Sequence, residues 1–356
     1  MIVIGADTHK SSHTLVAVDS VTGRRVGVCT VASTTAGALD ALSWARRVCG
    51  GADRVWAVED CRHVSGRLER LLISAGEAVV RVAPRLMAGA RSSGRERGKS
   101  DPIDATAVAR AAIREGVEQL PVARLEGAEL DVRLLLDHHD DLVKARSQSQ
   151  QRLRWHLHDL YDDLSIPAGA LDRTVWLDRV LGRLRRSPQT TRVRIARDLV
   201  CEIRGLTRRI RELEQEIRLL VCELCPQLVA MPGCGPLTAA KLLAEVAGAD
   251  RFKSDAKLAR AAGVAPVPAS SGRQDRHRLD RGGNRQLNLA LHRLAVNAAR
   301  HDPTTAAYLA RKQAQGMSRM EALRCLKRQL VRRVHKLLTQ PAHDQARAPE
   351  TALALT

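Results

Sequence analysis

Residues 2–19, IVIGADTHKSSHTLVAVD, decide how the N-terminal part of this chain folds. Two apolar runs, IVIGAD and TLVAVD, flank a polar turn and are rich in β-branched residues, which is typical of paired strands. Further along, RVWAVED (54–60) predicts another strand, SGRLERLLISAG (65–76) a helix and AVVRVAP (78–84) a last strand. This alternation of strands and helices indicates an α/β domain with a mixed sheet.

The composition points to a protein that binds nucleic acid. The chain has 356 residues, enough for two or three domains, and its 58 Lys and Arg against 39 Asp and Glu give a net charge of +19. Aromatic residues make up 2% of the chain, so contacts are expected mainly to phosphates and to nucleic-acid shape. The sequence has no run of 18 apolar residues and no signal-peptide pattern, so we expect a cytoplasmic, nucleoid-associated protein of bacterial type without membrane contact.

The chain is expected to have four parts. They are an α/β domain over 1–122, a helical coiled-coil region over 123–225, a mainly α C-terminal domain over 226–338 and a disordered tail over 339–356. The CxxC pair at 222–225 has no second pair beside it, so we expect reduced thiols rather than a zinc site. The coiled coil follows from apolar residues spaced alternately four and three. These residues are Leu199, Ile203, Leu206, Ile210, Leu213, Ile217, Leu220 and Leu224. The partner helix belongs either to the same chain or to another protomer.

The stretch GKSDPIDATAVAR (98–110) places Asp101 and Asp104 at the start of a predicted helix. On local grounds, Asp101 as N-cap and Pro102 as the first helical residue make an ordinary helix start, and the helix dipole favours both carboxylates. The alternative is that the two carboxylates are half of a metal site.

Two further acids favour the metal site. Asp7 and Glu59 each fall at the end of a predicted strand, where open α/β sheets place their site residues. Four carboxylates then converge on one sheet edge and suit Mg²⁺ ions that act in phosphoryl transfer. Strand, acid, hairpin, strand with acid and a late helix with two acids is the plan of an RNase H-like nuclease core. His9 and Lys10, beside Asp7, are either accessory residues of the active site or part of a polar turn, and we favour the turn.

The C-terminal region contains a glycine turn between two apolar helical patterns. In LVAMPGCGPLTAAKLLAEVAG (228–248), the turn at Gly233 and Gly235 resembles a helix-hairpin-helix, which presents backbone N–H groups to a DNA phosphate. A plain turn between helices explains the same pattern.

A second C-terminal stretch, APVPASSGRQDRHRLDRGGNRQLNLALHRL (265–294), combines two serines with many arginines. One interpretation is a basic loop that binds phosphates. The other makes a serine hydroxyl the nucleophile on a DNA phosphorus, while arginines neutralise the developing charge. Those arginines are Arg273, Arg276, Arg278, Arg281 and Arg285. No Ser-His-Asp set is evident, so a neighbouring acid, metal or arginine would have to activate the serine.

Taken together, the motifs resemble a known family. IGADTHKSSHTLVAV, VWAVEDCRHVSGRLERLL, GKSDPIDATAVAR, AMPGCGPLTAAKLLAEV and APVPASSGRQDRHRLDRGGNRQL occur in the order found in insertion-sequence transposases of the DEDD-plus-serine class, the bridge-RNA-guided recombinases. The C-terminal helices, HDPTTAAYLARKQAQGMSRMEALRCLKRQLVRRVHKLL, are similar to the end of that family. The resemblance covers nearly the whole chain up to the tail.

The resemblance implies a specific enzyme. The N-terminal domain would be RuvC-like, with an Mg²⁺-binding tetrad of Asp7, Glu59, Asp101 and Asp104. Ser271 would be the nucleophile that forms a covalent phosphoserine link, with strands exchanged through a Holliday junction. The implied partners are double-stranded DNA at the element ends and the target, a structured guide RNA, and further copies of this chain in a dimer or tetramer. The RNA would then read the sequence while the protein holds phosphates.

The sequence departs from the family pattern at one point and leaves one assignment open at another. The family often has Thr-Gly after the glutamate, whereas this chain has Asp60 and Cys61, so Asp60 is a candidate stand-in ligand. Ser270 adjoins Ser271, and we place the nucleophile at Ser271 because it directly precedes the glycine.

Two other functions compete with the transposase. One is an RNase H-like nuclease or junction resolvase that uses metal-activated water and no covalent serine. The other is a non-enzymatic, basic DNA-binding protein. A covalent protein–DNA adduct would separate the transposase from the resolvase, and metal-dependent cleavage of any kind would remove the non-enzymatic alternative.

Overall fold

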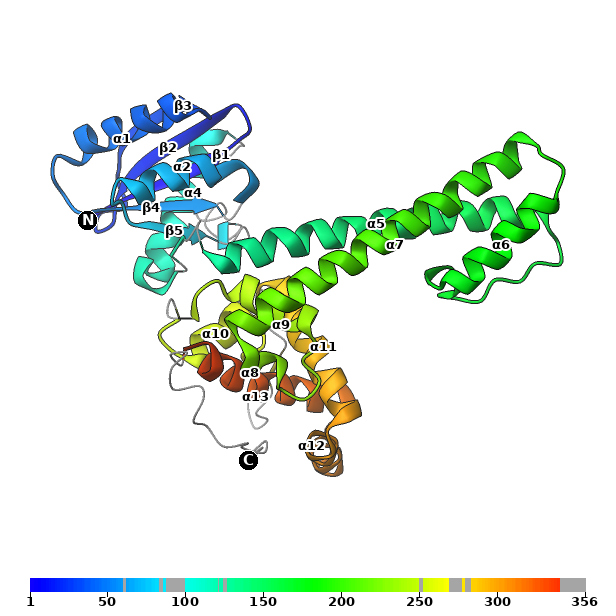
Figure 1. Ribbon diagram of the computed structural model, residues 1–356. Coiled ribbons are helices and arrows are strands. Elements are labelled where there is room, and N and C mark those ends of the chain that lie inside the picture. The colour runs from blue at the N-terminus through cyan, green and yellow to red at the C-terminus, as the bar shows by residue number, and fades with distance from the viewer. Residues whose placement is uncertain are drawn as a thin grey trace. The chain divides into compact units, whose positions relative to one another are not determined.

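The computed structural model describes residues 1–59, 62–82, 86–87, 100–120, 122–123, 127–249, 252–268, 277–278 and 283–339 (Figure 1). The predicted tail lies outside these ranges, apart from Thr339. The chain forms two units, Met1–Glu126 with Ala249–Lys257, and Gly127–Gly248 with Leu258–Thr356. The three boundaries between the four expected parts stay a prediction. No helix in the described ranges combines the length and the apolar character needed to cross a membrane.

The first unit is built on a five-stranded mixed sheet. Its strands are β1 (Ile2–Thr8), β2 (Ser12–Asp19), β3 (Arg25–Ala32), β4 (Arg54–Glu59) and β5 (Val79–Val82), in the order β3-β2-β1-β4-β5. β2 is antiparallel to β1 and β3, whereas β1, β4 and β5 are parallel. This topology confirms the predicted α/β domain of RNase H-like plan with a mixed sheet.

Helices cover both faces of this sheet. Alternate strand residues divide between two apolar clusters, because successive side chains of a strand point to opposite faces. Ile4, Leu15 and Trp56 pack toward α1 (Thr35–Cys49) and α2 (Arg62–Ser74). Val3, Val16 and Ala57 pack toward α4 (Asp101–Glu115), as do Val80 and Val82. Side chains near the start of α4 can therefore be contacted only by strand residues on this face of the sheet, the face of Val3 and Ala57.

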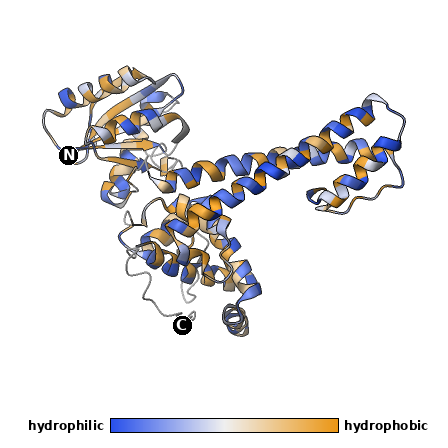
Figure 2. Cartoon of the chain, viewed as in Figure 1, coloured by the Kyte–Doolittle hydropathy of each residue, from blue (hydrophilic) through white to orange (hydrophobic). Residues whose placement is uncertain are grey.

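In the second unit two long helices run side by side in opposite directions. α5 (Ala128–Leu160) and α7 (Thr191–Leu224) are joined through η2 (Ala170–Asp172) and α6 (Thr174–Arg186) (Figure 1). Three side-chain pairs give the antiparallel register: Asp159 with Arg192, Arg152 with Glu202 and His139 with Glu214. In Figure 2 both helices alternate hydrophobic and hydrophilic patches along their length, as expected for helices that bury one stripe each.

The apolar residues that predicted a coiled coil on α7 have unequal burial. Leu199, Ile203, Ile210 and Ile217 are buried, whereas the leucines at 206, 213 and 220 are half-buried and Leu224 is exposed. The buried side of α7 thus combines one side of the predicted seam with the neighbouring Val200, Thr207 and Val221. The partner of α7 along this contact is a helix of the same chain.

The remaining helices of the second unit form its C-terminal part. They are α8 (Pro226–Val229), α9 (Pro236–Val246), the end of α10 (Asp255–Ala261), α11 (Arg285–His301), α12 (Pro303–Ala314) and α13 (Arg319–Thr339), with a two-stranded ribbon of β6 (Val267–Pro268) and β7 (His277–Arg278). α9 packs against α5, α7 and α11. Of the CxxC pair, Cys225 is buried, which raises the pKa of its thiol, and Cys222 is exposed.

Candidate functional site

Asp7 and Glu59 lie next to each other at the ends of two parallel strands. Ala6 pairs with Val58 in the register of β1 and β4, so the following residues, Asp7 and Glu59, stand side by side at the carboxyl ends of these strands. Both belong to the α4 face, because they continue the alternation of Val3 and Ala57. The sheet therefore presents two carboxylates to the start of α4.

A close approach of α4 to β1 adds two more carboxylates. A Cβ atom at Gly5 would collide with the backbone oxygen of Ala105, so glycine lets the helix pack directly on the strand. Asp101 and Asp104 occupy the first turn of that helix. The side chain of Asp101 is exposed, whereas Asp104 is buried.

The start of α4 differs from the local prediction. Ser100, not Asp101, is the N-cap: it has extended backbone angles and its carbonyl accepts from the N–H groups of Ile103 and Asp104. Asp101 is consequently the first helical residue, and Pro102 the second. Since Asp101 does not serve as the cap, capping does not account for both acids of this turn.

The electrostatics of Asp7 show that the carboxylates are close enough to interact. Its pKa is raised, first by burial and then by the negative charges of Asp104 and Asp101, while His9 acts in the opposite direction. A raised pKa means that folding makes the ionised form of Asp7 less favourable. Burial is the largest cause of this shift, and the charges of Asp104 and Asp101 add to it, so a cation bound beside Asp7 would favour its ionised form.

His9 contributes a nitrogen to the same cluster. Its backbone N–H donates to the carbonyl of Ser12 within the turn between β1 and β2, as the polar-turn interpretation implies. Its side chain, however, places Nε2 3.2 Å from Oδ2 of Asp7 and 3.7 Å from Oδ1 of Asp101. From the sequence, an accessory role of His9 in the active site was the less favoured of the two alternatives.

The donor set fits a divalent metal ion. Asp7, His9 and Asp101 each offer one ligand atom, and these three atoms lie within 4.8 Å of one another. Glu59 ends the neighbouring strand β4, and Asp104 lies three residues after Asp101 on α4. Carboxylate oxygens are suitable ligands for Mg²⁺ and Mn²⁺, and the burial of Asp7 keeps one of them partly shielded from water. Asp60, the candidate stand-in ligand, lies outside the described residues.

The loop that carries the two serines, residues 269–276, lies outside the described residues. The short strands on either side of it, β6 and β7, are described. Ser270, Ser271, Arg273 and Arg276 fall in the connection between β6 and β7, and Arg281 follows β7. The strands pair Val267 with Arg278 and Pro268 with His277, antiparallel. Arg278 lies in β7 by its backbone, and Arg285 is the exposed first residue of α11.

Beyond this ribbon, the backbone segments at Gly263 and Gly283 lie in direct contact. A Cβ atom at Gly283 would collide with the backbone of Gly263, so the two glycines are in contact. The amide of Asn288 donates to the carbonyls of Ala262 and Gly263, and its oxygen accepts from the buried Lys327. Ala262 and Gly263 are thus tied to α11 through Asn288, which in turn contacts Lys327 of α13.

The glycine turn between α8 and α9 has a packing reason of its own. Gly233 has φ +79°, and a Cβ atom there would collide with the backbone of Ala298 on α11. Gly235 is the N-cap of α9. These facts explain the glycine at 233 by turn geometry and by close packing on α11, and the predicted contact of this turn with a DNA phosphate stays a prediction.

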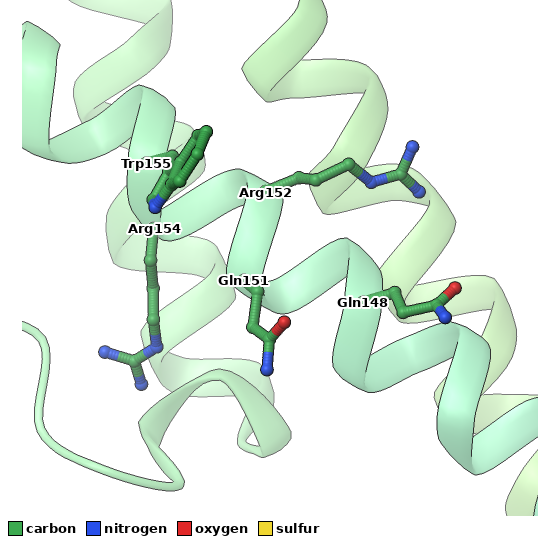
Figure 3. A pocket seen from close by; sticks show the side chains of 5 residues that line it. All are labelled: Gln148, Gln151, Arg152, Arg154 and Trp155. Atoms are coloured by element: carbon green, nitrogen blue, oxygen red, sulfur yellow. The ribbon is translucent and has the colours of Figure 1, made fainter.

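An open surface pocket lies on α5, in the other unit from the acids. It is lined by Gln148, Gln151, Arg152, Arg154 and Trp155, which Figure 3 shows along neighbouring turns of the helix. Trp155 is 83% exposed. Arg154 donates to the carbonyls of Ile166 and Pro167, and Arg152 donates to the hydroxyl of Ser149. Sequence reasoning missed this site because it counted aromatic residues and did not ask which of them stay exposed.

Comparison with known proteins gives matches along most of the chain. The family profile DEDD_Tnp_IS110, described as Transposase, matches residues 4–162, and the profile described as Transposase IS116/IS110/IS902 family matches residues 225–310. The uncharacterized 44.8 kDa protein of insertion element IS116 from Streptomyces clavuligerus is 28% identical, over 93% of this chain and 92% of its own length. The uncharacterized 43.6 kDa protein of insertion element IS110 from Streptomyces coelicolor is 37% identical, over 39% and 35%.

One solved structure also aligns with the chain. It is T. thermophilus RuvC in complex with Holliday junction substrate, with a TM-score of 0.27 and 16% identity, over 35% of this chain and 99% of that one. The RNase H-like assignment of the first unit rests on its strand order and strand directions and not on this superposition.

Proposed function

Because the chain belongs to the IS116/IS110 family of insertion-sequence transposases, we propose that it moves such an element under the guidance of a structured RNA, with Ser271 as its nucleophile. Transposases of this family are enzymes that cleave and rejoin DNA, so the alternative of a non-enzymatic DNA-binding protein is set aside. The observation that carries the proposal is the convergence of acids from β1, β4 and α4 inside the segment that matches the family's DEDD profile.

In the proposed reaction each half of the chain has its own task. Asp7, Glu59, Asp101 and Asp104 would hold Mg²⁺, which when bound would offset the negative charge that develops on the phosphate oxygens. Oγ of Ser271 gives up its proton as it attacks a DNA phosphorus, the bond from phosphorus to a deoxyribose oxygen breaks, and that oxygen takes up a proton. Attack by a deoxyribose hydroxyl on the phosphoserine ester then rejoins DNA and releases the serine. The arginines at 273, 276, 278, 281 and 285 supply positive charge for the phosphate.

The proposed function also includes the partners of the chain. The net charge of +19 supports binding of double-stranded DNA at the element ends and the target. The guide RNA is proposed from the family resemblance. A homo-oligomer, a dimer or tetramer, is also part of the proposal, and the half-buried leucines at 206, 213 and 220, spaced seven apart on α7, support it as an apolar row for a second copy.

The first test is the requirement for RNA and for metal. Purified protein, RNA transcribed from the non-coding DNA that flanks the reading frame, and a plasmid with both element ends should yield cleaved and rejoined products. Omitting the RNA or adding EDTA should reduce these products to background, because target choice and charge neutralisation are both lost. Gel electrophoresis measures the yield of cleaved and rejoined DNA. Products that form equally well without RNA would remove RNA guidance from the proposal.

Trp155 offers a specific contact for an unpaired base of the guide RNA. Of the seven aromatic side chains in the sequence, Trp155 alone is exposed, since the others are buried or half-buried. Gln148, Gln151 and Arg152 share its helix face, at spacings of seven, four and three residues. An indole plane beside amides and a guanidinium can stack on a base, hydrogen-bond to its edge and contact phosphate.

This contact predicts a selective defect in RNA binding. Trp155→Ala should weaken binding of a single-stranded RNA oligonucleotide by about tenfold, because one stacked base contributes roughly 1–3 kcal/mol. Trp155→Phe should retain most of the affinity, since a phenyl ring still stacks. Leu134→Ala, which removes another exposed apolar side chain of α5, is the matched control and should bind as wild type. An unchanged RNA affinity together with a changed oligomeric state would make Trp155 a protein contact instead.

A further inference from the structure

The imidazole of His9 bridges the two secondary-structure elements that bring the acids together. Asp7 comes from β1 and Asp101 from α4, and Nε2 of His9 approaches a carboxylate oxygen of each, at 3.2 Å and 3.7 Å. About half of the His9 side chain is exposed, so the ring lies at the mouth of the cluster, over the buried Asp7. One nitrogen therefore faces the same small space as two carboxylates.

These separations are those of neighbouring ligands on one ion. Ligand atoms at right angles on an ion with bonds of about 2.1 Å stand about 3 Å apart, and wider angles give longer separations. The three atoms lie within 4.8 Å of one another, a spacing from which small side-chain movements would bring all three onto a single cation. In the protein without metal, the same geometry lets His9 hydrogen-bond to Asp7, which lowers the pKa of Asp7 against the effect of burial.

We propose that Nε2 of His9 is a ligand of the metal ion held by Asp7 and Asp101, and that this nitrogen makes the site prefer Mn²⁺ to Mg²⁺. The inference rests on the metal site of the proposed function. Mg²⁺ is a hard cation that binds mainly oxygen, whereas an imidazole nitrogen suits later first-row ions better. Mn²⁺ accepts both the carboxylates and the imidazole, so a nitrogen donor raises its affinity more than that of Mg²⁺.

The nitrogen ligand can be observed directly on the full chain with Mn²⁺ as the probe. Pulsed electron paramagnetic resonance of bound Mn²⁺ should show coupling to a histidine ¹⁴N in the wild type and none in His9→Ala. Titration calorimetry should show a loss of Mn²⁺ affinity of about tenfold or more on this substitution. The Mg²⁺ affinity, measured by competition with Mn²⁺, should fall less. The ratio of Mn²⁺ to Mg²⁺ affinity should therefore be smaller in His9→Ala than in the wild type.

Two controls separate the possible failures. His158→Ala removes an exposed histidine of α5 and should leave the ¹⁴N coupling and both affinities unchanged. Asp7→Asn should abolish Mn²⁺ binding, because it removes a charged ligand of the site. If Asp7→Asn abolishes binding but His9→Ala keeps the coupling and the affinity, the metal site stands and the role of His9 is wrong. If neither substitution changes Mn²⁺ binding, the metal site of the proposed function is itself wrong.

Discussion

Replacing Ser271 with alanine should abolish a covalent protein–DNA adduct that the wild-type chain forms. A hydroxyl that attacks phosphorus must leave an ester between protein and DNA, so wild-type protein with its RNA and a nicked substrate should yield a complex that survives a denaturing gel. Without the hydroxyl, adduct formation should fall by at least about a thousandfold, as expected for the loss of a nucleophile. Alanine removes a single oxygen, so the free energy of unfolding should change by less than about 1 kcal/mol.

The neighbouring serine provides the control for this experiment. Ser270→Ala should retain the adduct, because the nucleophile is placed at the serine that directly precedes the glycine. Loss of the adduct in Ser270→Ala alone would keep the mechanism but move the nucleophile by one residue. If both variants still cleave and no adduct is ever trapped, while Asp7→Asn is inactive, the chain hydrolyses DNA with metal-activated water, as a resolvase does.

Asp104→Asn should eliminate metal-dependent strand cleavage while the protein remains folded. Asparagine has nearly the same shape but lacks the charge, so the metal site loses part of its attraction for a cation and cleavage in Mg²⁺ should fall by at least about a hundredfold. The charge of Asp104 is one cause of the raised pKa of Asp7, which marks a destabilising repulsion at neutral pH. Removing that charge relieves the repulsion but also loses its favourable interaction with the helix dipole, so the unfolding free energy, measured without metal, should change little.

The matched comparison for this variant is Ser100→Ala. Ser100 is the observed N-cap, and no hydrogen bond from its side chain caps α4, so its replacement should have little effect on either stability or cleavage. A folded Asp104→Asn protein that cleaves normally would show that Asp104 serves the helix dipole and not the metal. Circular dichroism melting and a cleavage time course measure the two quantities on the same preparations.

Several elements were predicted from local pattern, and others were missed for physical reasons. The strands at 2–7, 14–19 and 54–59 read clearly because they are buried and apolar. β3 (Arg25–Ala32) was missed because it is an edge strand with mostly exposed or half-buried residues, so its pattern is weak. The N-cap of α4 was misplaced by one residue, since Ser and Asp are both good caps and only the backbone geometry chooses between them.

The candidate site likewise contains residues that were predicted from local sequence and one whose role depends on distant contacts. Asp7, Glu59, Asp101 and Asp104 were predicted because each marks the end of a strand or the start of a helix, which are local features. His9 was interpreted as part of a turn, and its backbone does belong to one. Its side chain joins the acids only because α4, about ninety residues later, brings Asp101 to within 3.7 Å of it. The distance between these two side chains cannot be derived from their spacing along the chain.

The sequence by itself determined the α/β character of the first unit, the acids at its strand ends, the long apolar seam of α7 and the basic charge, because periodicity, turn residues and composition are properties of nearby residues. Tertiary structure decided that Asp7 and Glu59 face α4, that His9 lies between Asp7 and Asp101, and that α7 pairs with α5 of its own chain. The first two outcomes depend on strand register and on close packing at Gly5, and the third depends on packing between α5 and α7. All of these are contacts between residues distant in sequence.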